Sequence, residues 1–330
     1  MSKETEAPRQ HATAQMQQHK THAARLSIVS NSVLVALKLG VGLWTGSVSV
    51  LSEALHSATD LLASGIAYFS VRFSDQPPDE EHPYGHGKIE SLSGMAEALL
   101  IFVAAAFIIY EAIEKLRAPG DHSLMPDAGM AIMAVSVVVN IGMSRYLFRV
   151  AYATDSQALL ADAEHLRADV LTSLGVFVGL GLVRVTGQTY FDPITALLIS
   201  VVILHAAFRL TRNSYHLLLD RRLPPEEEAR IRALLEADTR VLGYHKLRTR
   251  KSGPYRHADV HVQIDDSHTL VEAHAISEEL EDHIRATLPS IEVNIHIEPY
   301  HAEMRHQQEA HGASPRRGAQ PATQPTDMVE

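Results

Sequence analysis

Two histidine–aspartate pairs with the same spacing stand out in the sequence. The segment SEALHSATDLLAS holds His56 and Asp60, and the segment ADAEHLRADV holds His165 and Asp169, four residues apart in each case. On an α-helix this spacing places both side chains on one face. Two imidazoles and two carboxylates suit tetrahedral Zn²⁺, would also admit Fe²⁺, Co²⁺ or Cd²⁺, and fit Ca²⁺ or Mg²⁺ poorly.

Both pairs lie in apolar segments long enough to cross a bilayer, whose hydrocarbon core needs about 20 helical residues. The Lys and Arg residues of the connecting segments favour cytoplasmic N- and C-termini. Lys38, inside the first segment, is expected to reach the aqueous interface beside Trp44. We therefore predict an α-helical membrane protein with six transmembrane helices, at residues 24–45, 48–73, 89–116, 126–149, 154–184 and 192–213.

Counting along the second and fifth segments places the two pairs at one depth. Asp60 lies about 13 residues before Phe73, and His165 about 12 residues after Ala153. At ~1.5 Å per residue, both lie roughly 18–20 Å from the cytoplasmic end, near mid-membrane. The four side chains are therefore expected to meet.

A simpler interpretation is that each pair only forms a hydrogen bond between helices, as buried polar groups commonly do. An isolated charge at the bilayer centre costs at least about 2.5–3.5 kcal/mol on insertion scales, so four ionisable groups favour a divalent cation as their partner. The matching second pair favours the metal site. Asp162 and Glu164 lie about one turn away and could line an access path, although contact with water explains them equally.

The composition excludes several kinds of chemistry. The 330 residues include 20 His and no Cys, so disulfides, iron–sulfur clusters, thiolate zinc sites and cysteine nucleophiles are ruled out. The formal charge of −10 argues against a nucleic-acid partner. The HExxH motif of membrane metalloproteases is absent from the sequence, which argues against an enzyme. A membrane-anchored metal sensor or scaffold is the competing class, but it would gain nothing from a mid-membrane site.

The sequence divides into four parts. Residues 1–22 are predicted to be a disordered tail that contains histidines, and residues 23–214 a transport domain. Residues 215–300 have the element order α-β-β-α-β of a small soluble α+β domain, ferredoxin-like or metallochaperone-like. Residues 301–330 are polar and are predicted to be a disordered C-terminal tail.

Taken together, these motifs resemble the cation diffusion facilitator family of dimeric metal/proton antiporters, over about residues 24–300. The resemblance rests on the six segments, the two HxxxD pairs, HPYGHGKIES after the second segment, and HKLRTRKSGP in the C-terminal domain. It looks closest to the bacterial zinc and ferrous-iron efflux branch. Many members of that branch carry Asp where this chain has His56, and a His-Asp/His-Asp quartet resembles the more zinc-selective members.

The resemblance implies a homodimer in the bacterial inner membrane that exports Zn²⁺ in exchange for protons. Fe²⁺, Cd²⁺ or Co²⁺ export by the same mechanism is the alternative. The coupling has a chemical basis, because His titrates near neutral pH and protons compete with metal for the same nitrogen atoms.

A second metal site is implied in the cytoplasmic loop after the second segment. Its matching positions are Asp79, His82 and His86 in PDEEHPYGHGK. Gly85 and Gly87 would let the loop fold around an ion. A solvated polar loop explains the same residues equally well.

The resemblance also implies a metal cluster in the C-terminal domain, for dimer closure and sensing rather than transport. An exposed alternating strand would explain His261 as an ordinary surface residue. Lys88 and Asp220 match positions that form a charge interlock at the dimer junction in relatives; a snorkelling Lys and a helix-capping Asp are the alternatives. The implied ligands of the cluster are His245, His261, His274, His296 and Glu298.

Overall fold

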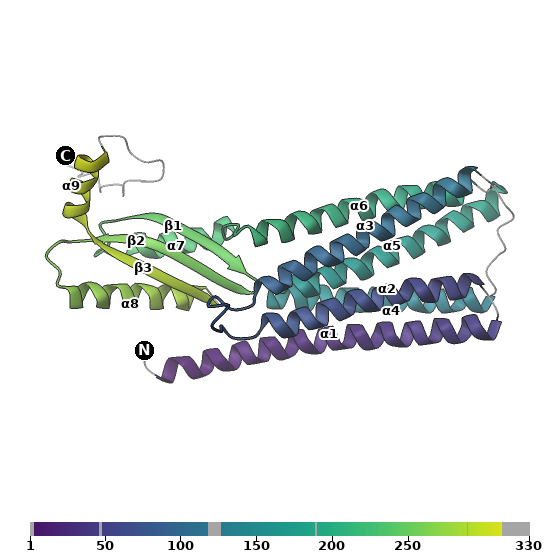
Figure 1. The fold of residues 1–330 in the computed structure, drawn as a ribbon, viewed down its shortest axis with the longest axis horizontal. Helices are drawn as coiled ribbons and strands as arrows, with labels where there is room; N and C mark the ends of the chain where they lie inside the picture. Colours follow the sequence, from purple (N-terminus) through teal and green to yellow (C-terminus); the bar gives the residue numbers. More distant parts are fainter. Residues whose placement is uncertain (1–2, 46–47, 118–126, 189, 289, 312–330) are drawn as a thin grey trace, which may run out of the picture. The chain divides into compact units, whose positions relative to one another are not determined.

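A computed structural model describes residues 3–45, 48–117, 127–188, 190–288 and 290–311. The chain forms two compact units, Met1–Leu218 and Leu219–Glu330 (Figure 1). The division lies close to the predicted boundary at residues 214 and 215.

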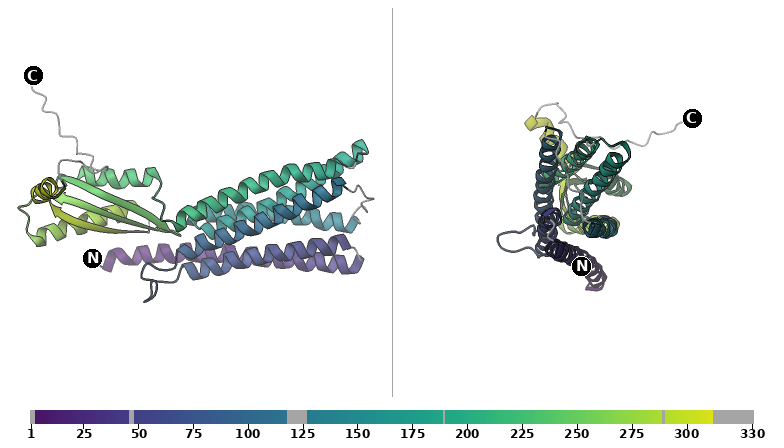
Figure 2. Two further views of the ribbon diagram at one scale, coloured as in Figure 1. Left: turned by 45° about the horizontal axis from the view of Figure 1, so that its top comes forward. Right: turned by 90° about the vertical axis from the view of Figure 1, so that its right-hand side faces the viewer.

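Helices that run side by side make up the first unit (Figures 1 and 2). Helix α3 packs against α6, α1 against α2 and α4 against α5, while α2 and α5 also contact each other. Within the described residues, the helices are α1 (Lys3–Thr45), α2 (Val48–Ser74), α3 (Lys88–Arg117), α4 (Asp127–Thr154), α5 (Gln157–Thr186) and α6 (Phe191–Leu218).

Four of these helices are long and apolar enough to cross a membrane over their described residues: Gln15–Trp44, Lys88–Arg117, Ala131–Thr154 and Phe191–Leu218. Helices α2 and α5 carry the two histidine–aspartate pairs.

The N-terminal segment differs from the predicted disordered tail. Its residues from Lys3 onward are helical and continue directly into the apolar part of α1. Extending an existing helix is favourable compared with starting one. Lys20 is buried, with its Nζ 2.6 Å from Asp75 Oδ1 and 3.2 Å from Glu90 Oε1. These ion pairs hold the polar segment against the bundle.

A three-stranded sheet with helices makes up the second unit (Figure 2). Strands β1 and β2 pair antiparallel, and β2 and β3 pair parallel, in the order β1-β2-β3. The element order from α7 to β3 is the α-β-β-α-β order predicted from the sequence. The elements are α7 (Pro225–Ala237), β1 (Gly243–Ser252), β2 (Tyr255–Ile264), α8 (Leu270–Thr287), β3 (Ile291–Pro299) and α9 (Tyr300–His311).

Helix α9 covers the first residues of the predicted C-terminal tail, which are therefore helical rather than disordered. The rest of that prediction, at residues 312–330, lies outside the described residues.

The two faces of the sheet differ in composition. Val260 and Val262 of β2 are buried in a core that Leu235 of α7 and Leu280 of α8 complete. Because strand side chains alternate between faces, His261 lies on the opposite face. The strand register aligns His261 with His245 of β1 and with His296 of β3, so three histidines form a row across the sheet.

Candidate metal centre

The paired residues of α2 and α5 converge inside the first unit. The ligand atoms of His56, Asp60 and Asp169 all lie within 4.8 Å of one another. His165 Nε2 lies 3.3 Å from Asp60 Oδ1, and both residues are buried. All four residues predicted from the HxxxD spacing are therefore close together.

Buried atoms of the quartet lack hydrogen-bond partners. Within the described residues, His165 Nδ1 and Asp169 Oδ2 have none. Such groups are costly to bury unless a partner compensates them. Two imidazoles and two carboxylates with unused lone pairs are a donor set that fits a tetrahedral divalent cation. The residues present therefore fit a metal ion as cargo.

A small cavity of about 10 Å³ adjoins the quartet, close to the volume that one water-sized probe occupies. His56, His165, Asp169 and Thr172 line one side of it, and residues of α3 and α6 line the other. This cavity therefore has room for about one water-sized probe.

Glu90 of α3 fixes the start of α5. Its Oε2 accepts hydrogen bonds from Ser156 Oγ and from the backbone N of Gln157, both at 2.7 Å. Ser156 is the N-cap of α5, and its hydroxyl accepts from the backbone N of Leu159. A carboxylate at a helix N-terminus is favourable because the backbone N–H groups there lack partners within the helix. The hydrogen bonds between Glu90 and the first residues of α5 therefore fix where His165 lies along the helix axis.

Helix α1 contacts the part of α2 that carries His56 and Asp60. Lys38 is buried and donates to Ser57 Oγ at 2.6 Å, so it does not extend to the interface as predicted. Asn31 Nδ2 donates to the backbone carbonyl of Asp60 at 3.5 Å and to Ser64 Oγ at 2.7 Å. These contacts could not be predicted from the sequence, because the partners lie 19 to 33 residues apart along the chain.

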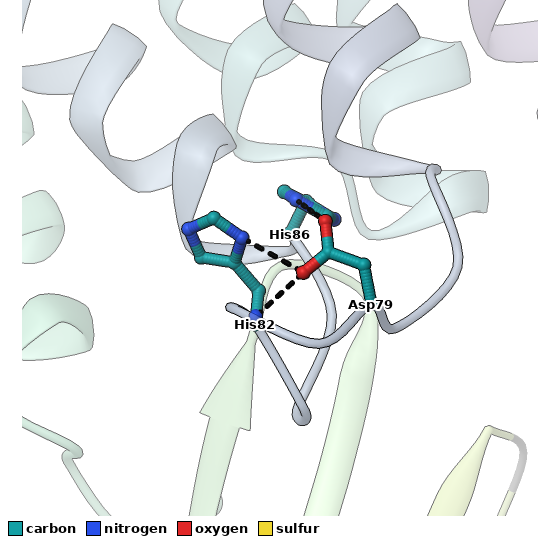
Figure 3. Close-up of side chains that lie close together, drawn as sticks. All are labelled: Asp79, His82 and His86. Atoms are coloured by element: carbon teal, nitrogen blue, oxygen red, sulfur yellow. Dashed lines mark hydrogen bonds and ion pairs between the residues drawn. The ribbon is translucent and has the colours of Figure 1, made fainter.

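The loop between α2 and α3 brings Asp79, His82 and His86 together (Figure 3). His82 Nδ1 lies 3.1 Å from Asp79 Oδ1, and His86 Nε2 lies 3.3 Å from Asp79 Oδ2. The backbone N–H of His82 donates to Asp79 and lowers the pKa of that carboxyl group. Gly85 has a φ of 75°, which the turn requires and which glycine adopts readily.

In the second unit, Glu298 lies between two histidines of the row. His261 Nδ1 is 2.5 Å from Glu298 Oε1, and His245 Nε2 is 3.2 Å from Glu298 Oε2. Burial lowers the pKa of His245, which favours the neutral imidazole that binds metal. His296 Nε2 lies 3.8 Å from Glu298 Oε1 with its side chain exposed.

The remaining proposed ligand, His274, does not join this group. Within the described residues, the group of mutually close ligand atoms consists of His245, His261 and Glu298. His274 lies on α8, its side chain is exposed, and its recorded acidic neighbour is Glu278 on the same helix, 3.6 Å away.

The two residues of the proposed charge interlock belong to different units. Lys88 Nζ donates to the carbonyl oxygen of Leu218 at 3.4 Å. Asp220 Oδ1 lies 3.5 Å from Arg250 Nη1. Their mutual pairing stays a prediction.

Family models match both units. The model of the cation efflux transmembrane domain matches residues 24–219, and the model of the cation efflux protein cytoplasmic domain, a dimerisation domain, matches residues 223–300. The chain belongs to the cation diffusion facilitator family. The sequence-based family resemblance and the fold prediction, a helical membrane domain followed by a small α+β domain, are thereby confirmed.

Two individual relatives, both cation-efflux pumps, agree with this assignment. The cation-efflux pump FieF of Citrobacter koseri is 36% identical over 279 residues, which is 84% of this chain and 92% of that protein. FieF of Pectobacterium atrosepticum is 35% identical over 292 residues, 87% of this chain and 96% of that protein. The metal-bound C-terminal domain of the CzcD transporter from Thermotoga maritima is 25% identical, covering 23% of this chain and 88% of that domain, with a TM-score of 0.22.

This diffusion facilitator is therefore a membrane-embedded cation efflux transporter. Family membership identifies the class of protein, and the geometry identifies three groups of side chains that could hold a metal ion among the described residues.

Proposed function

We propose that this transporter exports Zn²⁺ in exchange for protons, and that the cation binds between α2 and α5 during transport. The observation that carries the proposal is the convergence of His56, Asp60, His165 and Asp169. Two carboxylates balance the charge of one divalent cation in a medium where an isolated charge is costly. Two imidazoles favour zinc over harder cations.

The exchange with protons follows from the ligands. Zn²⁺ binds imidazole and carboxylate in their deprotonated forms, so a proton and the cation compete for each ligand. Alternating access would load the quartet from the cytoplasm and release the cation outside as protons replace it. The inward proton gradient then drives export.

The two other groups have auxiliary roles in this proposal. The loop group Asp79, His82 and His86 captures cytoplasmic metal near the entrance. The group around Glu298 binds metal in the cytoplasmic domain of a homodimer and tightens that dimer. The protein lies in a bacterial inner membrane with both termini in the cytoplasm, supported by the distribution of Lys and Arg.

Metal flux into proteoliposomes under an imposed pH gradient tests the proposal. Wild-type protein should accumulate Zn²⁺ only with the gradient, and Asp60→Ala and Asp169→Ala should each abolish that accumulation. Normal transport by both variants would contradict the proposal. Wild-type transport of Fe²⁺, Cd²⁺ or Co²⁺ in preference to Zn²⁺ would establish the alternative cargo, and no transport with retained metal binding would favour a sensor.

A further inference from the structure

A large cavity opens beside the N-terminal half of α1, where this helix passes the last turns of α2 and α4. Helix α1 packs against both helices and runs past the end of α2 (Figure 1). The cavity volume of about 1020 Å³ is at the upper end of the range for ligand sites in proteins. Among the described residues, it shares no lining side chain with the small cavity at the quartet. Its walls include residues between Gln17 and Arg25 of α1, Arg72 and Gln76 at the end of α2, and Tyr146 and Val150 of α4.

The cavity wall is cationic, although the chain as a whole has a formal charge of −10. The described lining residues include Arg25, Arg72, His19 and His22, whereas no Asp or Glu is among them. Arg25 and Arg72 belong to different helices, yet both guanidinium groups lie beside the hydroxyl group of Tyr68. Both arginines are exposed, and neither forms an ion pair with a described acidic residue. Two guanidinium groups therefore converge on one open space.

The carboxylate closest to the cavity in sequence is already paired. Asp75 directly precedes Gln76, but its Oδ1 lies 2.6 Å from Lys20 Nζ, and its side chain is only 5% exposed. Lys20 compensates this carboxylate, so Asp75 does not neutralise the cavity wall. A guanidinium group donates two parallel hydrogen bonds to the oxygen atoms of a phosphate or carboxylate group. The wall therefore suits an anion with several oxygen atoms.

The cavity lies at the level where the apolar segments end. Arg25 is at the start of the first predicted membrane segment, Arg72 is at the end of the second, and Tyr146 is near the end of the fourth. Lipid headgroups occupy this level outside the hydrocarbon core, and basic pockets between membrane helices bind the headgroups of anionic lipids. A dissolved phosphate ion offers the same oxygen atoms, but only a lipid is concentrated at this level.

We propose that the cavity binds the phosphate headgroup of an anionic phospholipid, with Arg25 and Arg72 donating hydrogen bonds to its phosphate oxygens. Gln76 and Tyr146 supply further hydrogen-bonding groups from the ends of α2 and α4. A headgroup in this position contacts three helices and holds the N-terminal half of α1 against α2 and α4. The site includes no residue of the three groups that could hold a metal ion among the described residues. The inference is therefore independent of the proposed metal/proton exchange.

Native mass spectrometry of the full-length protein in detergent measures the binding. The probes are phosphatidylglycerol, which is anionic, and phosphatidylcholine with the same acyl chains, which has no net charge. The wild type should bind phosphatidylglycerol with severalfold higher affinity. Arg25→Gln and Arg72→Gln should each weaken that binding about fivefold, because each removes one cation from the headgroup, and the double variant about 25-fold. Arg72→Lys keeps the charge without the planar fork and should weaken binding less than Arg72→Gln.

Arg212→Gln is the matched control. Arg212 is exposed and lies one residue before the end of the sixth predicted segment, as Arg72 lies one residue before the end of the second. Helix α6 contributes no described residue to the cavity. The control removes the same charge at the same end of the helices, and it should change the affinity for phosphatidylglycerol less than about twofold. Equal loss in Arg72→Gln and Arg212→Gln would overturn the proposal, because it would show attraction by surface charge alone.

Two further measurements decide the identity of the ligand. Inorganic phosphate at millimolar concentration should leave phosphatidylglycerol bound; displacement at that concentration would assign the cavity to a dissolved anion and contradict the lipid site. Thermal unfolding should shift to higher temperature with phosphatidylglycerol in the wild type and in Arg212→Gln, since a ligand of the folded state stabilises it. The double variant should lack this shift. Equal affinity of the wild type for the two lipids would also contradict the proposal.

Discussion

At the scale of single residues, His56 has the most informative position. The family resemblance predicts Asp at this position in many members of the bacterial zinc and ferrous-iron branch, whereas this chain has His. An imidazole is a softer and less charged ligand than a carboxylate. With two imidazoles, the quartet carries only the charge of two carboxylates, which is enough to balance one divalent cation.

Replacement of His56 should therefore change metal selectivity. His56→Asp should lower the ratio of Zn²⁺ to Fe²⁺ flux about tenfold, which corresponds to about 1.4 kcal/mol of differential stabilisation. Flux assays with Zn²⁺, Fe²⁺, Cd²⁺ and Mn²⁺ in proteoliposomes measure the ratio. Thr59→Ala, an exposed position on the same helix, serves as the control. An unchanged ratio would show that His56 does not set selectivity.

At the scale of elements, the sequence predicted the features that depend on the spacing of residues close together in the chain. The HxxxD pattern predicted side chains that face one another, and hydrophobic periodicity predicted the helices and the α-β-β-α-β order of elements in the cytoplasmic domain. Glu90 could not be predicted in the same way, because its partner Ser156 lies 66 residues away. For the same reason Lys20 was placed in a disordered tail although it is buried against Asp75. Long-range ion pairs leave no periodic signal in one sequence.

The outer parts of α5 and α6 approach closely at Gly179. A Cβ there would lie 2.9 Å from the Cα of Asp192, and it would also meet Thr195 Oγ1. Gly179→Ala should cost about 1–3 kcal/mol of stability because backbone must move. Thermal unfolding in detergent measures the change.

Gly142→Ala on α4 provides the matched control, since a Cβ there has no neighbour within 4 Å among the described residues. This variant should be neutral or stabilised by up to about 1 kcal/mol, because alanine favours helix. Equal stability of the two variants would contradict the proposed close contact.

The end of α7 has a pH-dependent ion pair. Hydrogen bonds from Arg240 lower the pKa of Asp238, and Arg240 also binds Glu279 of α8 at 2.7 Å. A carboxyl group with a lowered folded-state pKa stabilises the fold above its unfolded pKa of about 3.9, and this contribution is lost as pH falls. Asp238→Asn should therefore destabilise the cytoplasmic domain by up to about 1 kcal/mol at pH 7, after allowance for solvent screening.

Urea unfolding of the isolated cytoplasmic domain at two pH values checks this prediction. The difference between Asp238→Asn and wild type should shrink as the pH approaches 3. Thr269→Ala, which removes the N-cap of α8, should by contrast destabilise the domain at both pH values. A difference for Asp238→Asn that grows at low pH would contradict the assignment.

At the scale of the whole molecule, the chain couples two units with separate hydrophobic cores. One unit holds the quartet of His56, Asp60, His165 and Asp169, and the other holds the histidine row around Glu298. Because both groups offer imidazole and carboxylate ligands, we expect both to respond to the same cytoplasmic metal. Export activity and dimer strength are therefore expected to rise together as that metal accumulates.

Zn²⁺-dependent dimerisation should require His261. His261→Ala should weaken Zn²⁺-dependent dimerisation about tenfold or more, because it removes the ligand that shares Glu298 with His245. Sedimentation of the detergent-solubilised protein with and without Zn²⁺ measures this effect. His274→Ala should have a smaller effect, since His274 lies outside this group. Equal effects would show that His274 completes the site.

The Glu90 junction also limits how the bundle can deform. One buried carboxylate accepts from Lys20 of α1, Ser74 of α2 and the first residues of α5, and it belongs to α3. The ends of α2, α3 and α5 and the middle of α1 are therefore joined through one buried side chain. Rotation of the helices about Glu90 keeps these hydrogen bonds. Sliding any one of the four helices along its axis would break them and leave a buried charge without partners. The molecule thus contains a fixed pivot at one end, and the largest displacements are expected at the opposite ends of the same helices.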